Sequence, residues 1–375
     1  MSEETKTIRI ATFNVSMEAL NYLPKGQRES QKPTGKELGE SLANNHQQIK
    51  NIAEIIQRVN PDILLINEFD RTDNNGIALK QFIKRYLNES QHKQNAVDYP
   101  YYFQGPVNTG VKFPIDINDD GEITQPQDTY GYGHFPGHFG MALLSKFPID
   151  QNDIRTFQQF KWQDMPQAML PINPDTKQPY YNEEILSHFR LSSKSHWDIP
   201  VLVNGKSVRV LASHPTPPVF DGPEDRNGKR NHDEIRFWTD YITPEKASYI
   251  YDDTGHKGGI AQYSRFVILG DLNASTTDGD AVMSGIGTLL SHSNINDPKP
   301  ASQGGEKHRS DNPNGKHHTA YWGMRADYVL PSNQGWDVVD SGVFWPEQTS
   351  PMYRLVSDRS ASSDHRLVWV DLKIK

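Results

Sequence analysis

The sequence contains no cysteine, and this absence excludes disulfides, thiolate metal ligands and cysteine nucleophiles. It leaves the redox compartment undecided. No run of about 18 apolar residues occurs, so we expect no transmembrane helix. The first residues, MSEETKTIRI, lack the apolar segment of a secretory signal. Two locations therefore stay open: a periplasmic or secreted protein whose signal has been removed, or a cytoplasmic protein.

Positive charge is also scarce. Lysine and arginine together number 39 against 47 aspartates and glutamates, which gives a formal net charge of −8. A protein that coats DNA without sequence preference would be basic, so the charge balance argues against that class. It does not exclude a nuclease, because bound metal ions can offset the negative potential at the site alone.

The chain is long enough for a sizeable core. Hydrophobic residues make up 35% of the 375 residues, and 16 Tyr, 15 Phe and 7 Trp argue against a disordered chain. We find neither an internal repeat nor a convincing linker. The sequence therefore predicts one domain over residues 1–375, with polar insertions near residues 20–45, 105–136, 150–195 and 300–322.

Hydrophobic patterning indicates strands and helices in alternation. Residues 7–15 alternate between apolar and polar and predict a strand, whereas residues 46–59 carry isoleucines at helical spacing. The continuous apolar run in residues 62–68 predicts a buried strand. This order is typical of a layered α/β protein. Further helices are predicted over 77–90 and 232–242, further strands over 137–149, 264–275, 324–332 and 365–374, and a hairpin over 197–215.

Polar side chains of similar chemistry follow or end several of these strands. Each alone is more often a turn former, a helix cap or a structural histidine than a catalytic group. Six such segments in one chain favour a shared site. Their residues are Asn14, Glu68 with Asn67 before it, His214, Asp271 with Asn273, Asp327, and Asp364 with His365.

In this order, the segments resemble the endonuclease/exonuclease/phosphatase superfamily, whose fold is that of DNase I. The most specific part is GDLNAS followed later by SSDH, and the similarity extends from Ile8 to Leu372. The segment ASHPTPPVFDGPEDRNGKRNHDEIRFW resembles a bacterial branch that carries only the superfamily's name. The resemblance implies a four-layer α/β sandwich: two mainly antiparallel sheets packed together, helices outside, and an active site at one end of the sheets.

The resemblance also implies a metal centre. Glu68 would be the principal ligand, assisted by Asn14 and Asp364. Hard oxygen ligands suit Mg²⁺ or Mn²⁺. The family usually has a glutamine where this chain has Asn67. Phosphoester hydrolysis needs such a cation, an activated water and donors for the developing charge.

Catalytic roles follow from the same resemblance. His365 would act as the general base or hold the attacking water, with Asp327 orienting its imidazole. Asp271 would position or deprotonate the water, and Asn273 would donate to a phosphate oxygen. His214 would stabilise the transition state or protonate the leaving oxygen, a role that suits a group titrating near neutral pH. The sequence reveals no acidic partner for His214.

Two polar loops carry candidate substrate-binding residues. Arg226 and Arg230 follow His214, while His318 and Arg325 precede Asp327. Cations beside a metal-bound phosphate are expected to bind its oxygens. The alternative is that both loops are merely solvated. Trp322 could stack on a base or sugar, or belong to the core or a lid.

The stretch DINDDGEITQPQD has the spacing of a calcium loop. Asp116, Asn118 and Asp120 occupy its first, third and fifth positions, and a glycine follows at residue 121. The twelfth position is Gln127 instead of glutamate, so Asp128 would have to fold back. We expect a structural Ca²⁺ site formed by Asp116, Asn118, Asp120, Glu122 and Asp128; the alternative is a metal-free turn. An occupied weak site would favour a location outside the cytoplasm.

Three functions remain open from the sequence. The preferred hypothesis is a divalent-metal-dependent phosphoesterase that hydrolyses a phosphodiester or phosphomonoester of modest size. The alternative is a secreted DNase- or RNase-type endonuclease, for which nucleic acid would be the substrate. The third is a non-catalytic calcium-binding scaffold on the same fold. No obligate protein partner is evident.

Overall fold

The computed structural model describes residues 7–24, 26 and 31–375. It contains a six-stranded sheet in the order β10-β11-β1-β2-β4-β3 and a five-stranded sheet in the order β5-β6-β7-β8-β9. The strands are β1 (Thr7–Met17), β2 (Ile63–Phe69), β3 (Tyr101–Phe103), β4 (Met141–Ser145), β5 (Arg155–Thr156), β6 (His196–Val203), β7 (Lys206–Ser213), β8 (Phe266–Asp271), β9 (Asp327–Pro331), β10 (Trp336–Val343) and β11 (Val368–Ile374).

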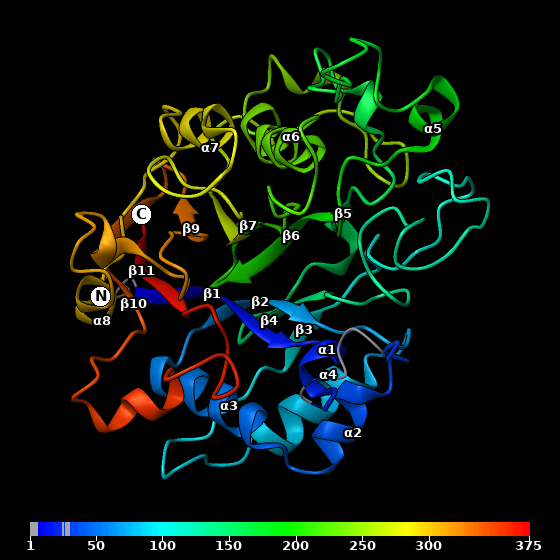
Figure 1. Ribbon diagram of the computed structural model, residues 1–375. Helices are drawn as coiled ribbons and strands as arrows, with labels where there is room; N and C mark the ends of the chain where they lie inside the picture. Colours follow the sequence, from blue (N-terminus) through cyan, green and yellow to red (C-terminus); the bar gives the residue numbers. More distant parts are fainter. Residues whose placement is uncertain (1–6, 25, 27–30) are drawn as a thin grey trace.

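Helices cover the outer faces of the two sheets. They are α1 (Ala19–Tyr22), α2 (Glu37–Ala43), α3 (Gln47–Val59), α4 (Ile77–Phe82), α5 (Glu183–His188), α6 (Arg226–Tyr241), α7 (Met283–Leu290) and α8 (Gln303–His308), with a π-helix at Ile83–Leu87 and 3-10 turns at Gln151–Asp153, Trp162–Asp164, Ala247–Tyr249, Gly315–His317 and Pro351–Leu355. In Figure 1, α1–α4 lie below the six-stranded sheet, while α6 and α7 lie above the five-stranded sheet. The predicted four-layer sandwich is confirmed.

The pairing within the sheets is mainly antiparallel. The exceptions are one parallel pair in each sheet, β1 with β2 and β7 with β8. These two pairs are central to the site, because the carboxyl ends of parallel neighbours reach the same edge of a sheet. Strand β9 runs antiparallel to β8 and pairs its first residue, Asp327, with Asp271.

Residues on the two faces of β8 enter different parts of the core. Val267 and Leu269 join the hydrophobic cluster that contains strands of both sheets and α3. Phe266 and Ile268 join the cluster that contains residues of α6. Side chains of a strand alternate between its faces, so burial of both faces explains why the apolar run is continuous. That residues 1–375 form a single domain remains a prediction.

Local sequence explains several element boundaries. Helix α3 ends at Asn60, which adopts the left-handed conformation with φ of 52°, and proline follows it. The β6–β7 hairpin turns at Asn204 and Gly205, both with positive φ, as a two-residue hairpin turn requires. This turn sets the register that brings His214 to the end of β7.

Three boundaries differ from the sequence-based expectation. Helix α6 begins at Arg226, about one and a half turns before the predicted start at His232. The helix expected over 77–90 changes at residue 83 from α to π geometry. Strand β10 was not predicted, because it is an edge strand whose residues 337–341 lack the alternation of a half-buried strand.

Within the described residues, no helix combines the length and apolarity that a bilayer crossing requires.

His196 couples folding to pH. Its Nε2 lies 2.8 Å from the Glu234 carbonyl oxygen and its Nδ1 2.5 Å from the Ser192 hydroxyl. One neutral tautomer satisfies both contacts, donating through Nε2 and accepting through Nδ1. Burial lowers the pKa of His196 from 6.5 to about 4, against the opposing charge of Glu234.

We therefore predict that acidification from pH 6.5 towards 4 lowers the free energy of unfolding. The unfolded histidine takes up a proton in this range and the buried one does not, so stability is present above pH 6.5 and is lost as pH falls. The contribution is roughly 3 kcal/mol at about 1.4 kcal/mol per pKa unit. Urea unfolding across this range should show a shallower pH dependence in His196→Gln, whereas a matched change at the exposed His92 should leave it unaltered.

Candidate active site

The predicted polar residues meet where strands of the two sheets end. Asn14 lies in β1 and Glu68 in β2, and both face the other sheet's His214 and Asp271. Close packing also holds β7 against β8 within the five-stranded sheet. A Cβ on Gly270 would lie 2.0 Å from the carbonyl oxygen of Ser213, so only glycine fits between β7 and β8 at this point.

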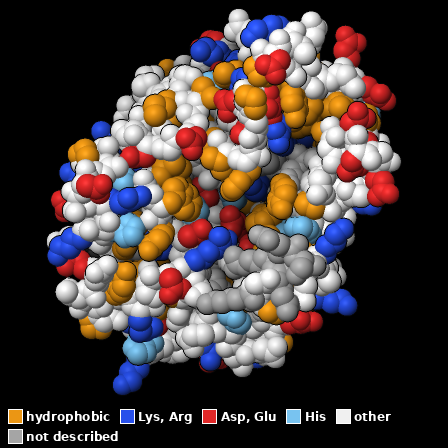
Figure 2. Space-filling view, in the orientation of Figure 1, with side chains coloured by type: hydrophobic (Ala, Val, Ile, Leu, Met, Phe, Trp, Pro, Cys, Tyr) orange, Lys and Arg blue, Asp and Glu red, His pale blue; other side chains and the backbone are white. Residues whose placement is uncertain are grey.

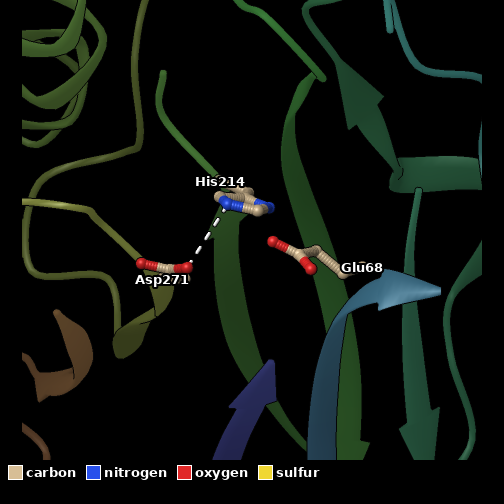
Figure 3. Close-up of side chains that lie close together, drawn as sticks. All are labelled: Glu68, His214 and Asp271. Carbon is tan, nitrogen blue, oxygen red and sulfur yellow. Dashed lines mark ion pairs between the residues drawn. The ribbon is translucent and has the colours of Figure 1, made fainter. Parts of the chain in front are cut away.

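Glu68, His214 and Asp271 form the first cluster. Each offers one metal-ligand atom, and these three atoms lie within 4.8 Å of one another. Figure 3 shows Glu68 reaching from β2 towards the His214–Asp271 pair of the other sheet. His214 Nε2 lies 3.3 Å from Asp271 Oδ2, which identifies the acidic partner that the sequence did not reveal.

Asp271 is the most connected of these side chains. Its Oδ2 accepts a hydrogen bond from Asn14 Nδ2 at 3.0 Å and lies 3.5 Å from His365 Nε2. Its Oδ1 accepts from the Asn273 backbone at 3.1 Å. Burial raises the pKa of Asp271, but His365, His214 and these hydrogen bonds outweigh it and hold the pKa below its usual range. The carboxylate therefore stays ionised at neutral pH.

His365 and Asp327 form a buried pair beside it. His365 Nδ1 donates to Asp327 Oδ2 at 2.9 Å, and the Thr319 hydroxyl donates to the same oxygen at 2.6 Å. Burial lowers the pKa of His365, yet Asp327 and Asp271 overcome this and raise the pKa above its ordinary value. A positively charged imidazole thus lies between two carboxylates, in the cluster of Asp271, Asp327 and His365.

Backbone conformation is unusual at the same place. Glu68 has φ of 55° and Asn273 has φ of 51°, in the left-handed region that non-glycine residues seldom adopt. Such conformations cost on the order of 1–3 kcal/mol and occur preferentially at functional sites. Burial raises the pKa of Glu68, which indicates a carboxylate that would be stabilised by a nearby cation.

The predicted metal ligands are not all brought together. Asn14 turns its amide nitrogen to Asp271, while its oxygen accepts from the Ser16 backbone at 3.1 Å. Asp364 accepts from the Ser16 hydroxyl at 3.1 Å and lies 3.4 Å from Arg359. Its carboxylate belongs to neither cluster described above. The donor set that fits a hard divalent cation is therefore Glu68 with Asp271, and His214 beside them.

Hydrogen bonds from buried side chains hold the turn that carries Asp364 and His365. Arg366 is buried and donates to the carbonyl oxygens of Ser363 at 2.8 Å, His365 at 3.0 Å and Val356 at 2.9 Å. The Ser363 hydroxyl donates to the Asn14 carbonyl at 2.7 Å. Sequence reasoning assigned no role to Arg366 or Ser363, since their partners are backbone atoms that a sequence pattern cannot indicate.

The predicted substrate-binding cations are engaged by the protein itself. Arg226 pairs with Glu224, and Arg325 binds Asp297 through two hydrogen bonds of 2.7 and 2.8 Å. Arg230 is buried and donates to three backbone carbonyls, those of Leu191, Tyr130 and Arg190. A role in substrate binding therefore stays a prediction for these arginines.

His318 and Arg325 line a cavity of about 410 Å³. His318 Nε2 lies 3.3 Å from Asp278, and its Nδ1 has no hydrogen-bond partner among the described residues. Trp322 is 45% exposed, and its ring stands edge-on to His365 at 5.0 Å between centroids. It is thus neither buried in the core nor distant from His365.

The predicted calcium loop lies outside both clusters. One carboxylate oxygen of each of Asp116, Asp120 and Asp128 lies within 4.8 Å of the others. Asp128 does fold back: it is buried, and it accepts from the backbone of Ile117 at 2.8 Å and of Thr124 at 2.9 Å. Asn118 donates to Asp120 at 2.9 Å, while the backbone of Glu122 donates to Asp120 at 3.0 Å.

Two cations near Glu68 were missed by sequence reasoning. The charges of Lys194 and Arg359 both act on Glu68. Lys194 follows the Gln- and Pro-rich stretch that reads only as loop, and Arg359 lies in a polar turn before Asp364. Because these residues approach Glu68 from distant parts of the sequence, the local pattern around Lys194 or Arg359 does not indicate the contact.

Comparison with known proteins agrees with this fold. No curated protein sequence matches the chain. An endonuclease/exonuclease/phosphatase protein from Beutenbergia cavernae has 17% identity and a TM-score of 0.53, covering 98% of this chain and 72% of that one. The human Nocturnin catalytic domain with bound sulfate has 14% identity and a TM-score of 0.49, covering 98% and 95%. The model of the Endonuclease/Exonuclease/phosphatase family matches residues 11–365, and the chain belongs to that family.

Proposed function

We propose that the protein is a divalent-metal-dependent phosphoesterase that hydrolyses a P–O bond of a phosphodiester or phosphomonoester by attack of water. The observation that carries this proposal is the convergence of Glu68, His214 and Asp271 from two sheets to within 4.8 Å. The adjoining His365–Asp327 pair supports it. A non-catalytic scaffold would not need these buried charges, whose burial disfavours folding.

A bound Mg²⁺ or Mn²⁺ would neutralise phosphate charge and polarise the P–O bond. Glu68 and Asp271 supply the hard oxygen atoms that would hold such an ion. The remaining work falls to the side chains. Asp271 stays ionised, so it can orient the attacking water.

His365 suits charge stabilisation better than proton abstraction. Two carboxylates keep its imidazole protonated, and a protonated imidazole cannot accept a proton. It can donate to a phosphoryl oxygen as negative charge develops. His214 Nδ1 is buried and has no hydrogen-bond partner among the described residues, while its Nε2 lies 3.3 Å from Asp271 Oδ2. Asn273 fixes Asp271 through its backbone and the loop after β7 through its amide, which donates to the Pro215 carbonyl at 3.1 Å.

We predict that His365→Ala and Glu68→Gln each reduce hydrolysis of bis-(p-nitrophenyl) phosphate by on the order of 10²–10⁴-fold, since the first removes a charged donor to the phosphoryl group and the second removes a carboxylate that would hold the metal ion. Rates should be measured with Mg²⁺ and with Mn²⁺. His92→Ala, at an exposed position, serves as the control and should retain the full rate. Unchanged turnover in His365→Ala would show that the catalytic assignment is wrong.

The substrate class that we favour is a small phosphoester. The net charge of −8 and the pairing of Arg226 and Arg325 with carboxylates leave few free cations for a polyanion. The second candidate, a secreted DNase- or RNase-type endonuclease, is favoured by the exposed Trp322 beside His365, because a base could stack on it.

These two candidates predict different activities with the same enzyme sample. We expect release of p-nitrophenol from bis-(p-nitrophenyl) phosphate but no nicking of supercoiled plasmid and no cleavage of single-stranded RNA at the same enzyme concentration. Nicking by the wild type that disappears in Glu68→Gln would instead establish the endonuclease. The Glu68→Gln control separates this activity from a contaminating nuclease.

We also propose that the Asp116–Asp120–Asp128 cluster, with Asn118 and Glu122, holds a structural Ca²⁺. A bound cation would offset the repulsion among three carboxylates in one loop. EGTA should therefore lower the melting temperature of the wild type and leave Asp120→Ala unaffected. An equal melting temperature with and without EGTA would identify a metal-free turn. Because free calcium is scarce inside cells, an occupied site would support a periplasmic or secreted location.

A further inference from the structure

Lys194 lies beside the candidate metal cluster on a rigid backbone. The Asn108 backbone donates to the Lys194 carbonyl at 2.9 Å, and the Asn108 amide donates to the Ser192 carbonyl at 2.8 Å. Ser193 donates through its backbone to Glu234 at 2.7 Å and through its hydroxyl to the His214 carbonyl at 3.4 Å. The segment is thus tied to the end of β7, the strand that delivers His214.

The ammonium of Lys194 has no partner of its own. The residue is only 6% exposed, yet no carboxylate among the described residues lies within ion-pair distance of its Nζ, and no acceptor forms a hydrogen bond with it. Buried lysines are nearly always paired, since an isolated buried charge is costly. An unpaired one therefore points to an anion that does not belong to this chain.

The charges around Lys194 define where that anion would lie. Burial lowers the pKa of Lys194, and the charges of Glu234, Glu68 and Asp271 raise it. Its own charge lowers the pKa of His214. All three members of the Glu68–His214–Asp271 cluster thus interact with this ammonium. Figure 2 shows acidic and basic side chains together in the hollow near the centre of the face that it presents.

Glu234 cannot serve as the missing partner. Its Oε1 accepts from the Ser193 backbone at 2.7 Å and its Oε2 from the Thr216 backbone at 2.6 Å, so both oxygens are in use. This carboxylate joins the Lys194 segment to the loop after β7. Glu68 and Asp271 remain, and they are the oxygens that suit a divalent cation. Two like charges, the ammonium and a metal ion, then need a shared counter-anion.

We propose that Lys194 binds a non-bridging phosphoryl oxygen of the substrate and is a further catalytic residue of the hydrolysis. The ammonium donates to that oxygen from the segment that is tied to His214 at the end of β7. This inference rests on the proposed phosphoesterase function. The role of Lys194 is to stabilise charge without transferring a proton, because the phosphoryl oxygen gains negative charge as water attacks.

The alternative is that Lys194 only balances the carboxylates. In that case its removal would strengthen divalent-cation binding, because a like charge is lost, and would leave phosphate binding unchanged. Under this alternative, removing Lys194 would also lower the melting temperature of the protein. Under our proposal, the loss of this unpaired charge should leave the melting temperature unchanged or raise it.

The test compares Lys194→Met with Lys194→Arg and with Lys177→Met, a change of an exposed lysine. In the presence of Mn²⁺, we expect Lys194→Met to lower kcat for bis-(p-nitrophenyl) phosphate by on the order of 10²–10³-fold, the usual effect of losing one donor to a developing oxyanion. The dissociation constant of inorganic phosphate, measured calorimetrically, should rise at least about tenfold. Lys194→Arg, which keeps the charge, should recover part of both losses, and Lys177→Met should match the wild type.

The outcomes separate the two proposals. Unchanged phosphate binding and unchanged kcat in a folded Lys194→Met variant would overturn the role of Lys194. A lower melting temperature together with unchanged phosphate binding in Lys194→Arg and Lys194→Met would assign it a structural role. Phosphate binding that weakens in Lys194→Met while the wild type hydrolyses no ester would support phosphate binding by Lys194 but contradict both its catalytic role and the proposed reaction.

Discussion

The contact of Asp271 with Asn14 holds the two halves of the site together. Asn14 belongs to one sheet and Asp271 to the other, and a hydrogen bond of 3.0 Å between their side chains joins them. The same carboxylate contacts His214 and His365, so one side chain sets the positions of both histidines. The parallel pairs β1/β2 and β7/β8 make this possible, since they bring four strand ends to one edge.

Buried charge is the constraint that follows from this arrangement. Asp271 and Asp327 are buried and Glu68 is partly buried within one small region, where isolated carboxylates would destabilise the fold. The protein compensates only in part. His365 neutralises the Asp271–Asp327 side, whereas Glu68 keeps a raised pKa and Lys194 remains unpaired. Under the proposed function, a bound cation would offset the charge of Glu68 and a phosphoryl oxygen would pair with Lys194.

Much of the fold and part of the site could be predicted from the sequence. Apolar runs that end in Glu68 or Asp271 indicate buried strands with polar ends, because this pattern depends only on neighbouring residues. Pairing between distant segments left no such signal. Asp271 as the partner of His214, and Asp297 as the partner of Arg325, became apparent only once the strands were in register. Basic loops that suggested free phosphate ligands proved to contain paired arginines, whereas the unpaired cation, Lys194, lay in a stretch without a motif.

The acidic loop at residues 116–128 and the active site are linked through the same insertion. Asp128 accepts backbone hydrogen bonds that close the loop, and its carbonyl accepts from the Phe113 backbone at 2.8 Å. Gly110 donates to the Gly131 carbonyl at 2.9 Å, and Gly131 packs so closely on Ser193 that a Cβ would lie 2.1 Å from the Ser193 carbonyl oxygen. Ser193 precedes Lys194. The acidic loop is thus joined, through these backbone contacts, to the segment that carries Lys194.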